Sequence, residues 1–235
     1  MGLNTIGRWI AKTYAAPNTS AKIQIRTLPT LTAAYNQAMH AKDWPAALAD
    51  VQKLAALSPT AENLRLLGNV QSNSRAPQDA LATYDKALAA AEAEKPAEGQ
   101  PDAAWKDEKS KILLAKGNAY LRLKRNSDAI ALYTKAAPLA EDPGTATFNI
   151  CATYYNLGDT QNAVPACRKA AAVSPANANV WFVLGSLLFA ESNLDAKGNI
   201  AITSECRETL EKYLKLVPDG PHAADVKAML NMGAR

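Results

Sequence analysis

The sequence lacks the features that mark membrane proteins, β-sheet proteins and most enzymes. It contains no run of 18 or more apolar residues, so no segment is expected to cross a bilayer as a helix. Only 6% of the residues are aromatic, and almost no segment has the alternating pattern of a strand. The HExxH, GxSxG and phosphate-loop motifs are absent, and His40 and His222 stand far apart in the sequence. The residues therefore predict no enzyme, no catalytic residue, no cofactor and no bound metal.

Cysteine is scarce, with three residues at small or core positions of the helical pattern. We expect Cys151, Cys167 and Cys206 to pack as small apolar side chains, as free cysteines usually do. Cys151 and Cys167 fall on two helices that should pair, so a disulfide between them is a second interpretation. Their spacing matches no zinc-binding pattern.

Acidic residues are missing from residues 1–42, which carry five Lys and Arg residues. The rest of the chain has 21 basic and 22 acidic residues, so the net charge of +4 arises in this first stretch. A nearly neutral remainder argues against nucleic acid as a partner. Residues 1–16 place apolar side chains at helical spacing around Arg8 and Lys12. They predict either a basic amphipathic helix on a membrane surface or partner, or a cap on a helical array.

One helical phrase occurs five times in the chain. In each copy a small residue is followed four and seven positions later by further apolar residues, which places all three on one side of a helix. The copies begin at Ala47, Ala80, Ala129, Ala163 and Cys206. Upstream of four of them, another helical segment carries a small residue at its centre, namely Gly68, Gly117, Cys151 and Gly185. Two helices can approach closely at such residues, so the pattern predicts an all-α fold of paired helices.

This pairing resembles the tetratricopeptide repeat, whose pattern of about 34 residues has a Trp, a Leu-Gly, a Tyr, an Ala, an aromatic residue and a closing Pro. Pro59, Pro175 and Pro218 match the closing prolines. The resemblance covers roughly residues 28 to 234. It implies a right-handed α-solenoid of about five helix-turn-helix repeats with terminal capping helices. The last repeat is similar to those of bacterial members of the family.

The resemblance also implies a division of the chain. Residues 1–27 form a basic N-terminal arm or capping helix, residues 28–220 form the array, and residues 221–235 form a C-terminal capping helix. Two intervals between the repeated phrases exceed the family period. They predict long helices and a loop near residues 90–110, and an insertion near residues 192–200. One elongated domain is expected, because each repeat contacts only its neighbours.

In tetratricopeptide arrays the first helix of each repeat lines a concave surface. The resemblance therefore implies a groove lined by amide and aromatic side chains, where amides hold the backbone of an extended peptide and aromatics receive its side chains. The two-carboxylate clamp of some family members is incomplete, because Ala115 and Thr145 occupy two of its positions. The candidate peptide- or partner-binding residues are Asn36, Arg65, Asn69, Asn118, Phe148, Asn149, Tyr155, Phe182, Ser186 and Phe189.

The expected function is that of a non-enzymatic interaction module that binds a peptide segment or a partner protein, of unknown identity, in this groove. The alternative is a structural or assembly protein that forms a homo-oligomer, or docks on a membrane or a neighbour through its basic N-terminal arm. The expected location is the cytoplasm, or the periplasm or exterior if a signal peptide has been removed.

Overall fold

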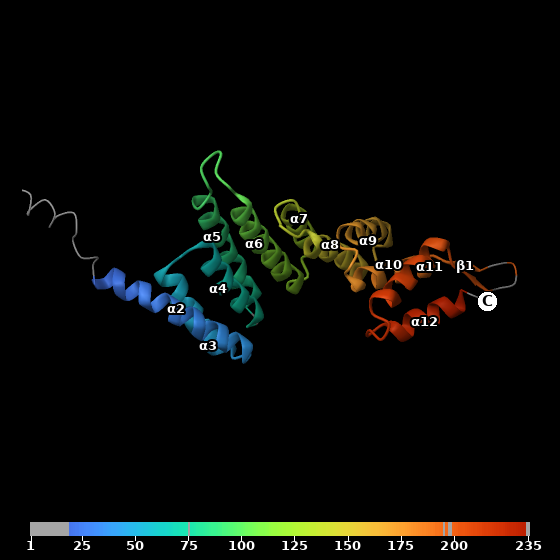
Figure 1. The fold of residues 1–235 in the computed structure, drawn as a ribbon, viewed down its shortest axis with the longest axis horizontal. Coiled ribbons are helices and arrows are strands. Elements are labelled where there is room, and N and C mark those ends of the chain that lie inside the picture. The colour runs from blue at the N-terminus through green and yellow to red at the C-terminus, as the bar shows by residue number, and fades with distance from the viewer. Residues whose placement is uncertain (1–18, 75, 195, 197–198, 234–235) are drawn as a thin grey trace, which may run out of the picture. The chain divides into compact units, whose positions relative to one another are not determined.

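The computed structural model describes residues 19–233 except residues 75, 195, 197 and 198, and describes side chains from residue 27 onward. Residues 1–18, and with them the interpretations of residues 1–16, lie outside the described residues. The described chain is helical apart from one short hairpin, as Figure 1 shows, which confirms the all-α repeat fold. The described residues divide into two compact units, with the boundary between Glu94 and Lys95.

The first unit contains two helix pairs in which consecutive helices pack on one another. Asp43 caps the second helix, because its carboxylate accepts a hydrogen bond of 3.1 Å from the Ala46 amide. The first helix continues unbroken through residue 27, where the sequence places the end of the arm. The helices are α2 (Thr19–His40), α3 (Trp44–Leu57), α4 (Ala61–Asn73) and α5 (Pro77–Ala93).

The second unit continues the pairing and ends in a single capping helix. Its predicted insertion is an antiparallel hairpin, β1 (Asn193–Leu194) with β2 (Ile200–Ala201). The helices are α6 (Ala103–Arg122), α7 (Asn126–Ala136), α8 (Gly144–Leu157), α9 (Thr160–Val173), α10 (Ala178–Ala190), α11 (Ser204–Leu216) and α12 (Ala223–Met232).

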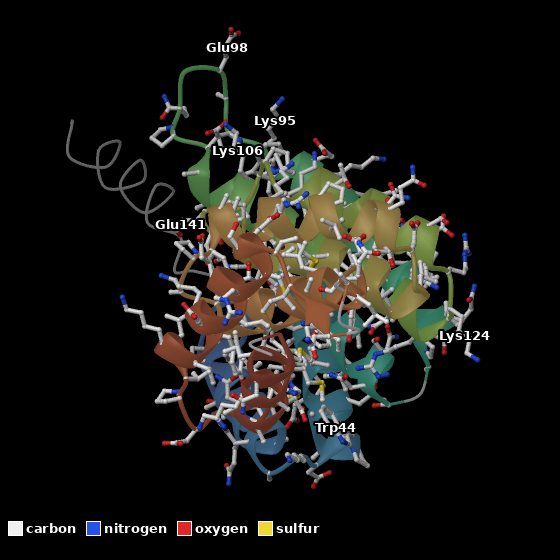
Figure 2. The ribbon with its side chains drawn as sticks, turned by 90° about the vertical axis from the view of Figure 1, so that its right-hand side faces the viewer. Trp44, Lys95, Glu98, Lys106, Lys124 and Glu141 are labelled. Atoms are coloured by element: carbon white, nitrogen blue, oxygen red, sulfur yellow. A yellow bond between two sulfur atoms is a disulfide. The ribbon has the colours of Figure 1, made fainter. Side chains whose placement is uncertain are left out.

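A projecting loop opens the second unit, and Figure 2 shows Glu98 at its tip. Residues 95–101 lie between α5 and α6, within the stretch near residues 90–110 for which the sequence predicts a loop. Asp102 precedes α6, but its side chain makes no capping hydrogen bond. It forms an ion pair of 2.9 Å with Lys106 instead. Trp105 lies under Lys109, whose Nζ is 4.9 Å from the ring centroid.

In two helix pairs, the two helices approach closely at a glycine of the first helix, which lies under a tyrosine ring of the second. A Cβ atom on Gly68 would lie 2.5 Å from Cε1 of Tyr84, and one on Gly117 would lie 2.5 Å from Cε1 of Tyr133. Both tyrosines are at most 1% exposed. Glycine is therefore required at these positions by the close approach of the ring.

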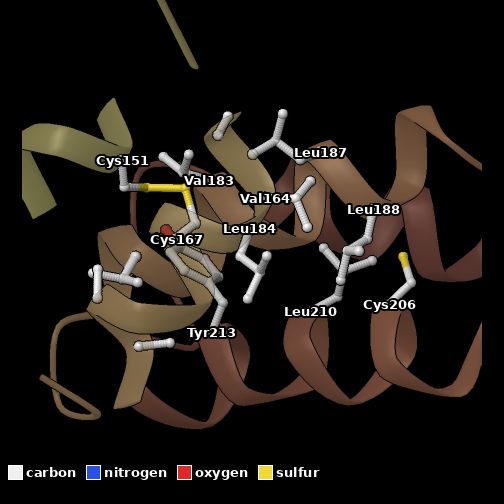
Figure 3. Close-up of a cluster of buried hydrophobic side chains, with 14 of the residues drawn as sticks. Cys151, Val164, Cys167, Val183, Leu184, Leu187, Leu188, Cys206, Leu210 and Tyr213 are labelled. Carbon is white, nitrogen blue, oxygen red and sulfur yellow. A yellow bond between two sulfur atoms is a disulfide. The ribbon is translucent and has the colours of Figure 1, made fainter. Parts of the chain in front are cut away.

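A disulfide occupies the corresponding place in the pair α8–α9. Cys151 and Cys167 are bonded and fully buried, and they are separated by 16 residues, as Gly117 and Tyr133 are. Both cysteines belong to the apolar cluster of the second unit, and Figure 3 shows their bond within it. The interpretation of these two cysteines as free apolar side chains is wrong, because pairing of the helices brings their Cα atoms to 4.7 Å. Cys206 is free and buried as predicted, and burial raises the pKa of its thiol.

Substitution of Gly117 by alanine is expected to lower the free energy of unfolding by about 1–3 kcal/mol, because the new methyl group overlaps the buried ring of Tyr133. An ordinary helical glycine would instead gain up to about 1 kcal/mol on the same change. Urea unfolding followed by circular dichroism measures the difference. Lys135→Ala, at an exposed position of α7, is the control and should change little. Stabilisation by Gly117→Ala would contradict the close packing.

Candidate peptide-binding site

Two predicted site asparagines bond to the tyrosines that close the helix pairs. The Tyr84 hydroxyl donates a hydrogen bond of 2.8 Å to Oδ1 of Asn69, and the Tyr133 hydroxyl donates one of 2.6 Å to Oδ1 of Asn118. Burial raises the pKa of Tyr133, so its hydroxyl stays a donor at neutral pH. These asparagine side chains therefore help to hold the first helix of each pair to the second. Their Oδ1 atoms, which a peptide N–H group would approach, already accept a hydrogen bond from tyrosine.

The first unit holds three of the predicted residues, Asn36, Arg65 and Asn69. Asn36 is exposed on α2, and Arg65 is half-buried on α4. Burial raises the pKa of Tyr35, and the positive charge of Arg65 partly opposes this rise. The guanidinium of Arg65 therefore interacts electrostatically with the Tyr35 hydroxyl. The remaining predicted residues belong to the second unit. Each unit thus carries its own share of the predicted set.

In the second unit, α8 presents a stripe formed by Phe148, Ala152 and Tyr155, which follow one another at helical spacing. Phe148 is half-buried against the core, while Tyr155 is 37% exposed. The predicted residue Asn149 is half-buried beside the stripe, and its carbonyl accepts a hydrogen bond from the Thr153 hydroxyl. Sequence reasoning missed Ala152, although the spacing of four and three residues from the two aromatics indicates it.

A matching stripe on α10 consists of Phe182, Ser186 and Phe189, all half-buried. Because α8 packs directly against α10, the two stripes lie on neighbouring helices. Phe182 is covered by the His222 ring, with centroids 3.8 Å apart and planes at 6°. It also meets the ring of Tyr213 at 5.9 Å. Phe182 therefore packs against the C-terminal segment. The residues of this stripe that lie beyond the contact with His222 are Ser186 and Phe189.

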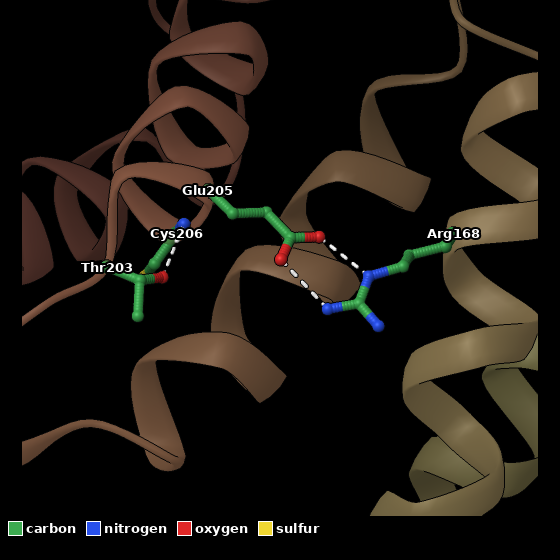
Figure 4. A network of polar contacts seen from close by, with 4 residues as sticks. All are labelled: Arg168, Thr203, Glu205 and Cys206. Carbon is green, nitrogen blue, oxygen red and sulfur yellow. Dashed lines mark hydrogen bonds and ion pairs between the residues drawn. The ribbon is translucent and has the colours of Figure 1, made fainter.

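A different hollow of about 590 Å³ lies where α9, α10 and α11 meet. Ala171, Trp181 and Leu184 contribute to its apolar lining. Arg168 and Glu205 line it as well and join α9 to α11 through two hydrogen bonds, of 2.7 and 2.8 Å, as Figure 4 shows. Sequence reasoning did not find this hollow, because the ion pair joins residues far apart in the sequence.

The described residues offer little for other kinds of site. No group of three or more His, Cys, Asp or Glu side chains gathers among them in a way that could hold a metal ion. None of the helices in the described part of the chain is both long enough and apolar enough to span a membrane.

Comparison with known proteins agrees with the paired helices. Residues 112–147 and residues 153–197 each match a family model of the tetratricopeptide repeat. The chain therefore contains tetratricopeptide repeats. Tetratricopeptide repeats generally serve in protein–protein interaction. No curated protein matches the sequence.

Solved structures of low sequence identity share the fold. PilW, described as a widely conserved type IV pilus biogenesis factor, matches with a TM-score of 0.66 at 14% identity, over 96% of this chain and all of that one. PilF of Pseudomonas aeruginosa matches with a TM-score of 0.65 at 14% identity, over 90% of this chain and 89% of that one. YrrB, described as a TPR protein with an unusual peptide-binding site, matches with a TM-score of 0.54 at 19% identity, over 83% and 88%.

The ion pair between α9 and α11 makes stability depend weakly on pH. Hydrogen bonding to Arg168 lowers the pKa of Glu205 in the folded chain, so the pair stabilises the fold above the unfolded pKa and is lost as the pH falls through the folded one. Both side chains are about half exposed, so Glu205→Gln should cost at most about 1 kcal/mol at pH 7. Below about pH 4 the cost should shrink, as chemical denaturation at several pH values can show.

Glu211→Gln is the matched control, because Glu211 is exposed on the same helix. A cost for Glu205→Gln that is unchanged at low pH would show that the carboxylate charge does not contribute.

Proposed function

We propose that this protein is a peptide-binding module whose second unit holds an extended segment of a partner protein along α8 and α10. The observation that carries this proposal is the pair of adjoining stripes, which combine half-exposed aromatic rings with hydroxyl and small side chains. Aromatic surface that stays partly open to water gains free energy when a ligand covers it. Tyr155 is the most suitable anchor, because it is the most exposed of these rings.

The asparagines have a smaller part in this proposal than in the prediction from sequence. Asn69 and Asn118 keep their side-chain NH2 groups for a ligand, because the tyrosine hydroxyls already donate hydrogen bonds to their Oδ1 atoms. Replacing them would also weaken the helix pairs. Tyr155 is therefore the better position at which to separate binding from folding. YrrB, which shares the fold, is described as a peptide-binding protein, and this supports the class of ligand.

Tyr155→Ala should weaken peptide capture at least about tenfold, because truncating a central aromatic anchor removes about 2 kcal/mol of binding free energy or more. The immobilised full chain is used to select from a library of random 12-residue peptides, and the affinities of the selected peptides are measured by fluorescence anisotropy. Tyr155→Phe, which keeps the ring, should retain most of the affinity.

Glu211→Ala serves as the control, since Glu211 is exposed on α11, the second helix of its pair, and lies outside both stripes. Failure to select any peptide, or equal binding by wild type and Tyr155→Ala, would refute the proposed site.

We also propose that the chain works in an oxidising compartment, such as the periplasm, rather than in the cytoplasm. The support is the disulfide between Cys151 and Cys167, because such bonds persist in oxidising surroundings and are rare where thiols are kept reduced. The bond is fully buried in the core of a helix pair, which suits a permanent structural link rather than an exchanging one.

Thiol labelling of the chain from its native cells tests this location. After unfolding without a reductant, an alkylating reagent should modify Cys206 alone, and mass spectrometry should show one adduct per chain. Reduction before labelling should raise the number to three, since all cysteines are then available. Three adducts without reduction would place the working chain in a reducing compartment.

A further inference from the structure

In the second unit, the first helices of the three helix pairs, α6, α8 and α10, differ sharply in their content of charged residues. Neither the 14-residue α8 nor the 13-residue α10 contains an Asp, Glu, Lys or Arg residue. The preceding first helix, α6, is rich in such residues. Between residues 102 and 128 the chain has seven basic and four acidic residues. One unit therefore combines an uncharged surface with a positively charged one.

The uncharged stretch would select against charge in a ligand. A ligand side chain that lies against Phe148, Tyr155 or Phe189 loses water on one side, and an ionised group there would find no opposite charge on α8 or α10. Burial of an unpaired charge is costly, whereas an apolar side chain gains free energy in the same place. Neutral hydroxyl and amide groups, such as those of Ser186 and Asn149, suit the backbone of the ligand.

The positive charge gathers toward the end of α6 and the turn that follows it. Arg122, Lys124 and Arg125 are all exposed there, and Figure 2 shows the side chain of Lys124 pointing outward. Arg125 lies 4.5 Å from the centroid of the Tyr120 ring and forms an ion pair of 2.7 Å with Asp128. The acidic residues are fewer than the basic ones in this stretch, so its net charge stays positive whatever pairs form. Such a surface attracts carboxylates.

The opposite end of the uncharged stretch is closed by the C-terminal segment. His222 stacks on Phe182, and the Tyr213 hydroxyl accepts a hydrogen bond of 3.0 Å from the His222 amide. A ligand on α10 therefore meets a covered ring at this point. Helix α6, which carries the basic surface, lies on the side of α8 away from α10 in Figure 1. The two ends of a bound segment would meet different chemistry.

We propose, building on the function proposed above, that the ligand of the second unit is an extended segment with acidic residues at one end and a run of uncharged, mainly apolar residues at the other. The acidic end lies at the basic surface of Arg122, Lys124 and Arg125, and the apolar run lies over the stripes of α8 and α10.

Four fluorescent 12-residue peptides test this selectivity. All share one uncharged core of Leu, Phe, Ser and Val residues, and they carry three Glu or three Lys residues at either the N- or the C-terminal end. Anisotropy titration of the full chain in 50 mM NaCl should show at least about tenfold tighter binding of one Glu peptide than of its Lys counterpart. Higher ionic strength should narrow this difference, because it screens exposed charges. Tyr155→Ala should weaken the binding of that Glu peptide.

The double variant Arg122→Glu, Lys124→Glu should abolish or reverse the preference for the Glu peptide. Its matched control is Lys135→Glu, Lys169→Glu, which makes the same change in net charge at exposed positions of α7 and α9 and should keep the preference. Equal binding of Glu and Lys peptides, or an equal effect of the two double variants, would overturn the inference. Peptides that bind through Tyr155 without charge selection would leave the proposed function intact. Absence of Tyr155-dependent binding by every peptide, including those from the random library, would refute both.

Discussion

The close approach of two helices at one small residue is the constraint on which this structure depends. In two pairs a tyrosine ring lies directly on a glycine, at a distance that leaves no room for a methyl group. The ring fills the space between the helices, and its hydroxyl reaches the asparagine that follows the glycine. One contact therefore fixes the separation of the two helices and also the orientation of an asparagine amide on the first helix.

The pair α8–α9 solves the same problem with a covalent bond. Cys151 takes the place of the glycine and Cys167 that of the tyrosine. A disulfide is smaller than a tyrosine ring, and it carries no hydroxyl that could hold a polar neighbour. The residue after Cys151 is accordingly Ala152 rather than asparagine, and α8 presents an aromatic and apolar stripe where α6 presents an amide. The difference in surface chemistry between α6 and α8 thus accompanies the difference in how each pair is closed.

Much of the fold could be predicted because its signals are local. The spacing of small and apolar residues indicates each helix pair, and Asp43, the proline-rich break and the insertion mark helix ends that depend only on nearby residues. The site was less predictable, because its chemistry depends on contacts between distant segments. The bond from Tyr133 to Asn118, the stack of His222 on Phe182 and the Arg168–Glu205 pair have no local signal. The groove residues remain a prediction, with the functions of Asn69, Asn118 and Phe182 in packing now visible.

The loop that precedes α6 has a consequence for how the chain can be divided. Glu94 closes the first unit, since its carboxylate accepts a hydrogen bond of 2.8 Å from the Ala61 amide at the start of α4. Residues 95–101 then belong to no helix, and every helix pair lies wholly on one side of them. A cut in this loop would sever the chain without interrupting a helix or separating the partners of a pair. The gene could therefore exchange or duplicate either unit at this point while keeping each helix with the partner that packs against it.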